Sequence, residues 1–409
     1  MNTDDVRNRI QAAAERYTPD VTAFLRAMIA IPSESAGERA VVERAAAEMR
    51  ALGFEEVKID GFGNLLGRMG NGPKVVALDG HIDTVGVGDR STWTRDPYAG
   101  AIENGVLYGR GASDQEAGVA TAIYGARIAK DLGLLDGVSL WVTATVMEED
   151  CDGLCWQYIL KEGVLKPDVV VITEPTNLQV YRGHRGRMEM EVRTQGRSAH
   201  GSAPERGVNA VYKMAPIIRE IEALNEALAA GADPFLGKGS VTIAEVRSTS
   251  PSLCAVADSC TIHLDRRLTR GETLASAVSE VEALPAVKAA GAKVTVLDYA
   301  REGYTGLVYP TQKYYPTWLT AEDDPAVRAA VTAGTIALGR SPVVGKWVFS
   351  TNGVATAGMF GVPTVGFGPA NEIYAHTPDD QCPVADLTRA MAFYAAFSSA
   401  WIDAQKDKQ

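Results

Sequence analysis

His81 and Asp83 follow the apolar run Val75–Asp79 and are separated by one residue. In an extended chain, residues two apart project to the same side, so both side chains can address one site. A histidine that binds metal usually has its second ring nitrogen held by a carboxylate or a carbonyl oxygen. Asp83 could therefore orient His81, although a lone His-x-Asp pair is weak evidence for a metal site.

Asp114 lies in a glycine-rich loop, Gly109–Asp114, just before a segment that is patterned as a helix. Capping a helix N-terminus is a common use of aspartate, and on its own this reading would be preferred. Three other glycines, Gly67, Gly70 and Gly72, precede a strand where a dinucleotide-binding motif would require a helix, so we expect them to form a hairpin turn.

Further acidic residues follow two strand-like runs. Glu148 and Glu149 come directly after the run Ser139–Val146, and Glu174 comes directly after Val169–Thr173. In an open parallel sheet, the carboxyl ends of the strands line one edge, where ligands bind. We therefore expect these glutamates to meet His81 at that edge.

Several carboxylates at one edge would repel each other strongly and force some to take up protons unless a cation lies between them. A divalent metal resolves that conflict. His376, in the late loop Tyr374–Pro378, could add a second imidazole to the same site. Mixed histidine and carboxylate ligands with positions left for water fit a catalytic zinc site better than a structural one.

The elements that must position these residues alternate between helix and strand in the first part of the chain, as in an α/β sheet. Helical patterning covers 38–52, 117–132, 325–338 and 387–401, and the strand-like runs include 74–79, 139–146, 168–173 and 364–367.

Between these parts, the pattern changes to alternating strands around two helices, which indicates a compact α+β insert. Its strands are expected at 187–194, 240–248, 259–268 and 293–299, and its helices at 209–229 and 274–284. The predicted fold is an α/β catalytic domain, residues 1–184 and 318–409, interrupted by a smaller α+β domain, residues 185–317. Two domains also suit a chain of 409 residues.

The overall composition is that of an ordinary globular protein, with 46% hydrophobic and 22% charged residues. A net charge of −11 argues against nucleic-acid or anionic-membrane partners. Because no signal peptide or membrane-length apolar run is present, a cytoplasmic location is expected. Five cysteines, an odd number, favour reduced thiols over a disulfide framework.

The residues named so far resemble the M20 family of metallopeptidases and deacylases over nearly the whole chain. The resemblance rests on segments that occur in the family's order: Gly80-His81-Ile82-Asp83-Thr84, Gly109-Arg110-Gly111-x-x-Asp114, Glu148-Glu149, Glu174-Pro175-Thr176, Ser198-Ala199-His200-Gly201 and Ala375-His376-Thr377. It implies a zinc-peptidase-like catalytic domain with an inserted lid and dimerisation domain.

For the metal centre, the resemblance implies two zinc ions per subunit, for which cobalt or manganese could substitute. His81 and Glu174 would hold one ion, Glu149 and His376 the other, and Asp114 would bridge them. The resemblance also implies a cis peptide bond after the bridging acid, between Asp114 and Gln115.

Glu148 would be the general base, and Asp83 would support His81. The resemblance assigns His200 to stabilising the tetrahedral intermediate. In dimers of the family, this histidine and the asparagine that matches Asn209 often reach the partner's active site, so a homodimer formed through the lid is expected.

Arg267 matches the family arginine that grips a substrate carboxylate, work suited to a planar, bidentate donor. A salt bridge with Asp265 or Glu272 is an equally good reading of the same residue. Asn352 and Gly353 are expected near the substrate. The segments 150–156 and 350–353 are most similar to a subgroup labelled selenium-metabolism-linked hydrolases. Two departures from the commoner deacetylase pattern are Gln115-Glu116, after the bridging acid, and the segment 350–353.

The function that follows is hydrolysis of the amide bond of an N-acylated amino acid or short peptide. A dipeptidase, a carboxypeptidase or an N-carbamoyl amidohydrolase could use the same site, and a non-catalytic, metal-stabilised binding protein is the alternative from another class. Cys151 and Cys155 follow the glutamates, but their spacing is not that of a common zinc finger, so we expect them to be core residues.

Overall fold

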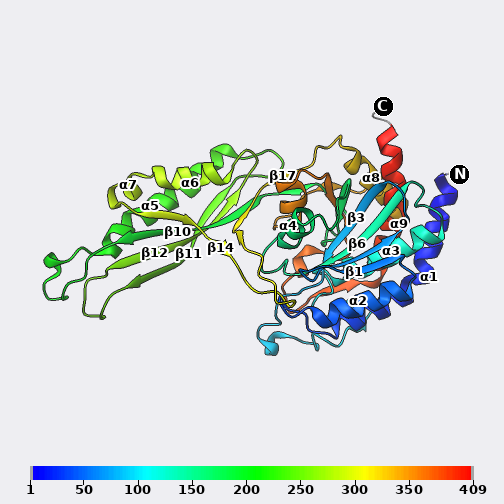
Figure 1. Cartoon of the computed structure of the whole chain (residues 1–409), viewed down its shortest axis with the longest axis horizontal. Helices are drawn as coiled ribbons and strands as arrows, with labels where there is room; N and C mark the ends of the chain where they lie inside the picture. Colours follow the sequence, from blue (N-terminus) through cyan, green and yellow to red (C-terminus); the bar gives the residue numbers. More distant parts are fainter. Residues whose placement is uncertain (1–2, 407–409) are drawn as a thin grey trace.

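The computed structural model describes residues 3–406 and separates them into two bodies, which lie at opposite ends of the molecule in Figure 1. The larger body contains an eight-stranded sheet in the order β1-β2-β6-β3-β7-β19-β8-β18. Its strands are β1 (Glu56–Ile59), β2 (Leu65–Met69), β3 (Lys74–His81), β6 (Val138–Thr145), β7 (Val169–Ile172), β8 (Val180–Tyr181), β18 (Val344–Gly345) and β19 (Thr364–Gly366).

The centre of this sheet is parallel and fully covered. β3 pairs in parallel with both β6 and β7, and every residue of β6 and β7 is buried. Strands covered on both faces are built from near-continuous apolar runs, which is the pattern of these segments. Helix α3 (Glu116–Asp131) packs on β3 and β6, with α1 (Thr3–Ile29) and α9 (Val384–Lys406) packed against it.

Other helices of the larger body complete its core. Helix α2 (Arg39–Ala51) packs on β1 and β2, α4 (Leu154–Lys161) follows the loop after β6, and α8 (Pro325–Leu338) packs along α9. A small sheet in the order β20-β5-β4 lies beside them, built from β4 (Ala101–Glu103), β5 (Val106–Tyr108) and β20 (Gln381–Pro383). None of the helices within residues 3–406 combines the length and apolar character needed to cross a membrane.

The smaller body is an antiparallel sheet with helices on one face. Its strand order is β11-β12-β10-β13, with β16 also paired to β10. The strands are β10 (Gly186–Gln195), β11 (Ser240–Thr249), β12 (Ser259–Leu268), β13 (Lys293–Val296) and β16 (Tyr314–Tyr315), and the helices are α5 (Ala210–Ala227), α6 (Leu274–Ala283) and α7 (Pro285–Ala290).

Burial alternates along β10, so that Met188, Met190 and Val192 join a hydrophobic core separate from that of the larger body. The polar residues of the same strand lie on the opposite face, as expected of a half-covered sheet. The bodies are joined at β9 (Gly183–His184), which pairs with β17 (Trp318–Leu319), and by the pair β14 (Asp298–Tyr299) and β15 (Thr311–Gln312) nearby.

The predicted fold class, an α/β catalytic domain with a smaller α+β insert, is confirmed. The predicted domain boundaries stay a prediction. The expected hairpin around Gly70 and Gly72 is wrong, because β6 lies between β2 and β3 in the sheet. Those glycines instead carry the chain past the start of β6, where a side chain at residue 72 would collide with the backbone of Gly137 and Val138.

Candidate active site

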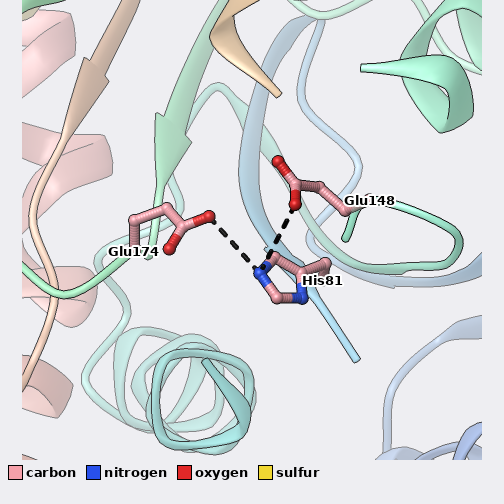
Figure 2. Close-up of side chains that lie close together, drawn as sticks. All are labelled: His81, Glu148 and Glu174. Atoms are coloured by element: carbon pink, nitrogen blue, oxygen red, sulfur yellow. Dashed lines mark ion pairs between the residues drawn. The ribbon is translucent and has the colours of Figure 1, made fainter. Parts of the chain in front are cut away.

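The histidine and acidic residues predicted to converge do lie together, at the carboxyl edge of the central strands. His81 ends β3 and is in register with Thr145 near the end of β6, while Asp79 pairs with Ile172 at the end of β7. The residues that follow these strands therefore emerge side by side. Figure 2 shows His81 with Glu148 and Glu174 directed toward its ring.

His81 is at the centre of the first group of side chains. Its Nε2 atom lies 3.4 Å from Glu174 Oε1, 3.8 Å from Glu148 Oε2 and 3.1 Å from Asp114 Oδ1. These side chains are almost completely buried. In one group of possible metal ligands, one atom each from His81, Glu148 and Glu174 lies within 4.8 Å of the others.

Asp114 connects the first group to a second one. One of its oxygens contacts His81, and the other, Oδ2, lies 3.2 Å from Nε2 of His376. The same His376 nitrogen is 2.9 Å from Glu149 Oε2. Asp114 is thus placed between the two imidazoles, as a carboxylate that bridges two ions would be.

The loop that carries Asp114 is fixed by a residue that the sequence did not single out. Asp380, fully buried, accepts hydrogen bonds from the backbone N–H groups of Gly111 (2.9 Å) and Ser113 (2.7 Å), and Arg110 pairs with it at 3.0 Å. The bond from Asp114 to Gln115 is a cis peptide bond, as the resemblance implied.

Asp83 contacts both His81 and the glutamate loop. The Nδ1 atom of His81 lies 2.8 Å from the main-chain oxygen of Asp83 but 3.7 Å from its carboxylate. The carboxylate instead accepts hydrogen bonds from the backbone N–H groups of Glu148 (3.2 Å) and Glu149 (3.1 Å). Asp83 therefore orients His81 through its carbonyl group and holds the glutamate loop through its side chain.

Protonation in this cluster reflects the competition between burial and neighbouring charges. Burial raises the pKa of Glu149 to about 7 and that of Glu174 to about 8. Hydrogen bonds to Asp114 and Glu149 raise the pKa of His376 to about 10. Burial opposes ionisation of Asp114, but its two histidine partners outweigh burial and lower the pKa of this carboxyl.

The donor set fits divalent cations. One oxygen each of Glu148, Glu149 and Glu174 is buried without a hydrogen-bond partner, which is costly for a carboxylate unless a cation satisfies it. Four carboxylates and two imidazoles also match the oxygen and nitrogen ligands used in catalytic zinc sites. Ligand protons would have to leave on binding, since metals bind the deprotonated groups.

A cavity of about 340 Å³ opens onto this cluster, and both bodies contribute to its wall. Besides the proposed metal-site residues and Glu148, the wall contains Arg267, which was expected from the sequence to contact substrate, and five residues to which no role was assigned from the sequence: Asp152, Arg187, Phe349, Ser350 and Glu372. Asp152 and Ser350 lie in the segments quoted for the subgroup resemblance, which gave them no role, and Arg187 comes from the smaller body while the other four come from the larger one.

Arg267 forms one of the salt bridges that the sequence left open, while its role toward substrate stays a prediction. Its Nε and Nη2 atoms lie 2.7 Å and 2.9 Å from the two carboxylate oxygens of Asp265, which is a bidentate salt bridge. The side chain is nevertheless about one-third exposed and lines the cavity. Its neighbour Arg266 is fully buried and pairs with Glu272 and Glu280.

Asn352 and Gly353, expected near the substrate, lie behind the cluster. The amide of Asn352 donates to Asp79 and Thr145 and accepts from Gly153 and Cys155, so all its hydrogen-bonding positions are used inside the protein. At Gly353, a side chain would approach the ring of Trp318 to 2.3 Å. Neither residue is in the cavity wall.

His200 and Asn209 lie on the smaller body and outside the wall of the cavity. His200 is exposed and contacts Ser202, and Asn209 caps the N-terminus of α5. Cys151 and Cys155 are buried, as expected of core residues, and are absent from the groups of possible metal ligands found within residues 3–406.

Comparison with known sequences agrees with this arrangement. A model of the family described as "Peptidase family M20/M25/M40" matches residues 77–400. An uncharacterised protein of Escherichia coli strain K12, YgeY, is 52% identical over 389 residues, which are 95% of this chain and 96% of that protein. An acetylornithine deacetylase of Klebsiella pneumoniae strain 342 is 34% identical over 277 residues, 63% of this chain and 70% of that enzyme.

Solved structures share the fold at low sequence identity. A structure described as a dinuclear metal-binding peptidase of the M20 family, from Bacillus subtilis, has a TM-score of 0.69 at 14% identity and covers 96% of this chain and 99% of its own. A tripeptidase of Staphylococcus aureus has a TM-score of 0.70 at 19% identity, with 94% and 99% covered.

Proposed function

This chain belongs to the peptidase family M20/M25/M40, and on that premise we propose that it is a di-zinc hydrolase that cleaves the amide bond of N-acylated amino acids or short peptides. Membership makes it a hydrolase acting on amide bonds. The observation that carries the finer proposal is the position of Asp114 between His81 and His376, with a carboxylate beside each imidazole.

In this proposal, His81 and Glu174 would hold one ion, Glu149 and His376 would hold the other, and Asp114 would contribute to both. Two ions held in this way would polarise the substrate carbonyl and lower the pKa of water toward neutrality. Zinc is the proposed metal, and cobalt or manganese could replace it because these ligands discriminate weakly between them.

Glu148 is the proposed general base. It takes a proton from the attacking water and returns it to the leaving nitrogen. One of its oxygens, Oε1, is buried without a hydrogen-bond partner and is available for that proton. The 3.8 Å separation from His81 also fits a ligand role, so the roles must be separated by substitution.

Substrate contacts in this proposal come from both bodies. Arg267 lines the cavity and would bind the carboxylate of the substrate with the N–H groups that Asp265 does not use. His200 would stabilise the tetrahedral intermediate. Since His200 and Asn209 lie outside the cavity wall of their own chain, we propose that they act on the site of a partner subunit in a homodimer.

Hydrolysis of dipeptides, removal of a carboxyl-terminal residue and hydrolysis of N-carbamoyl amino acids use the same chemistry. Related folds cover this range, since one solved structure is described as human carnosine dipeptidase 1 and another as a hydantoinase/carbamoylase family amidase. A protein that only binds its ligand would have no use for Glu148 as a proton shuttle.

The test is a panel of N-acyl amino acids, dipeptides and N-carbamoyl amino acids, assayed after reconstitution of the metal-free protein with zinc, cobalt or manganese. We expect turnover of N-acyl amino acids at rates of about 1 s⁻¹ or more, two metal ions per chain and loss of activity on chelation. Preferential turnover of dipeptides or carbamoyl compounds would favour an alternative. Full occupancy by metal without turnover of any class would contradict the proposal.

A further inference from the structure

The loop after Glu148 and Glu149 is attached to residues that come much later in the chain. Asp150 accepts hydrogen bonds from Tyr299, at 2.9 Å, and from Arg301. The Sγ atom of Cys151 lies 3.2 Å from the hydroxyl oxygen of Tyr315. Asp152 also contacts the chain beyond residue 184, so three consecutive residues, 150–152, are attached to that part of the chain.

Asp152 completes a closed ring of contacts among four side chains: Cys151, Asp152, Arg187 and Tyr315. Its Oδ2 atom lies 3.1 Å from Nε of Arg187. Arg187 is directly opposite Tyr315 in the pairing of β10 with β16, and its guanidinium lies 4.7 Å from the centre of the Tyr315 ring. Two consecutive loop residues, Cys151 and Asp152, therefore contact two paired residues of the smaller body's sheet.

The ring is in a protected position. Tyr315 and Cys151 are fully buried, and Asp152 is 7% exposed. The side chain of Arg187 is about one-fifth exposed and also lines the cavity. Breaking a buried ion pair by removing one partner leaves the other charge uncompensated, so the ring resists separation of its members.

The same loop is also held by other residues of the larger body. Asp83 accepts the backbone N–H groups of Glu148 and Glu149, and Glu38 accepts that of Met147 at 3.1 Å. Met147 adopts a φ of 63°, a left-handed conformation at the sharp turn just before the two glutamates. The glutamates thus lie between anchors on two bodies.

From this geometry we propose that Cys151, Asp152, Arg187 and Tyr315 are positioning residues that tie the placement of Glu148 and Glu149 to the position of the smaller body. The proposal rests on the proposed function for the roles of the two glutamates. The anchors on the smaller body, Arg187 and Tyr315, belong to the two strands nearest its junction with the larger one. A shift of that sheet would therefore be transmitted to the loop through two side-chain contacts.

A different role for Arg187 must be distinguished from this one. As a cationic residue in the cavity wall, it could instead bind an anionic group of the substrate. Such a residue would affect KM for anionic substrates, and its substitution would not be reproduced by substitution of Asp152. A positioning residue would affect kcat, and substitution of either partner would have the same result.

The first experiment needs neither metal nor substrate. Backbone hydrogen exchange of the segment 147–155 is compared in the metal-free wild type, Asp152→Asn, Arg187→Met and the control Arg193→Met, which changes an exposed arginine on the same face of β10. We expect exchange to be at least about threefold faster in the first two variants and unchanged in the control. Unchanged exchange in Asp152→Asn and Arg187→Met would overturn the proposal.

The second experiment measures kcat and KM with the substrate found in the panel. We expect kcat to fall about tenfold or more in Asp152→Asn and in Arg187→Met, with little change in KM, and the double variant to lose no more than the worse single variant. Tyr315→Phe keeps the aromatic side chain beside the Arg187 guanidinium and removes the hydroxyl contact with Cys151. This variant should show a smaller loss of kcat.

Arg187→Lys keeps the charge but loses the planar group over Tyr315, so it should recover part of the kcat that Arg187→Met loses. A change in KM alone would assign Arg187 to substrate binding and overturn the proposal. A lower melting temperature with unchanged kcat and unchanged exchange would make the ring merely structural. If no substrate is turned over but exchange responds as expected, the proposed function fails and the positioning role stands.

Discussion

At the scale of single residues, the site gathers more negative charge than the protein alone can neutralise. Glu148, Glu149 and Glu174 each bury an oxygen without a partner, and Asp114 is shared by two imidazoles. Such a set is stable with protons or with cations between its members, and only the second arrangement leaves a carboxylate ready to accept a proton at neutral pH.

The role of Glu148 is tested by Glu148→Gln. The amide is nearly the same size but cannot take up a proton, so we expect a loss of about 10²- to 10⁴-fold in kcat with both metal ions retained. Metal content by mass spectrometry and steady-state kinetics on the same preparation are the measurements. Loss of one metal ion would instead identify Glu148 as a ligand, and near-normal kcat would remove it from the mechanism.

For Arg267, the expected effect depends on the charge of the substrate. Arg267→Ala should raise KM for substrates with a free carboxylate by about 10- to 100-fold, the value of a hydrogen bond to a charged group. The corresponding amides should be unaffected. Arg270→Ala changes an exposed arginine three residues further on and is the matched control. Equal effects on acids and amides would show that Arg267 only pairs with Asp265.

Residue types and spacing were sufficient to predict that His81, Glu148 and Glu174 lie together, because they follow strands whose ends must meet in a parallel sheet. They could not predict Asp152, Arg187 or Glu372 in the cavity wall. Asp152 and Glu372 reach the cavity from two distant segments of the larger body, and Arg187 reaches it from the smaller body, so no local pattern records their meeting.

At the scale of secondary-structure elements, periodicity predicted the strands and helices closely where burial was one-sided or complete. The expected strand 259–268 and helix 325–338 coincide with β12 and α8. The connection of β2 to β3 was misread, because a turn of glycines does not reveal that another strand lies between its neighbours. The first helix, α1, was not anticipated, although it packs against α3 and α9.

Asn352 shows the same limit within an element. A resemblance in sequence placed it near the substrate, while the structure places it one layer deeper, between Asp79 and the start of α4. A motif identifies a conserved place in the chain order of a family but does not distinguish a residue that touches the substrate from one that holds its neighbours.

His184, in the two-residue strand that joins the bodies, gives the junction a dependence on pH. Its Nε2 atom accepts hydrogen bonds from the indole of Trp318 (2.7 Å) and the backbone of Thr351 (3.0 Å), which only a neutral ring can do. Burial lowers the pKa of His184 to about 4 from the usual 6.5.

Between those two pH values the unfolded chain binds a proton at this position and the folded chain does not. Protons therefore favour unfolding, and the stability contributed by neutral His184 is complete above about pH 6.5 and is lost as the pH falls toward 4. Between pH 7 and pH 5 we expect a loss of about 2 kcal/mol of unfolding free energy from this group.

The measurement is the denaturant dependence of unfolding at pH 7 and pH 5 for the wild type and His184→Gln. The variant should be less stable at pH 7 but should lose about 2 kcal/mol less than the wild type on acidification. His263→Gln is the control, because that histidine is partly exposed and pairs with Glu189 away from the junction. Equal acid sensitivity in the wild type and His184→Gln would contradict the assignment.

At the scale of the whole molecule, one chain contains all of the proposed metal ligands of the site but does not place the proposed oxyanion donor in it. His200 is exposed on the smaller body and does not line the cavity of its own chain. If the catalytic unit is a homodimer with exchanged histidines, two inactive variants should complement each other, because symmetric dimers exchange subunits into mixed pairs.

His200→Ala and Glu148→Gln should each be nearly inactive alone. In a mixed dimer, the subunit carrying His200→Ala keeps its own Glu148 and receives an intact His200 from the partner, so one of the two sites works. Purification through both tags leaves only mixed dimers, in which one of the two sites works, so the activity should be about half of that of the wild type. Differently tagged chains are co-expressed, the dimers are purified through both tags, and their activity is measured. The control pairs Arg193→Met with Glu148→Gln, so that one site in each dimer is fully intact. Mixed dimers that form but stay inactive would place His200 in the site of its own chain. Full activity of His200→Ala alone would place His200 outside catalysis.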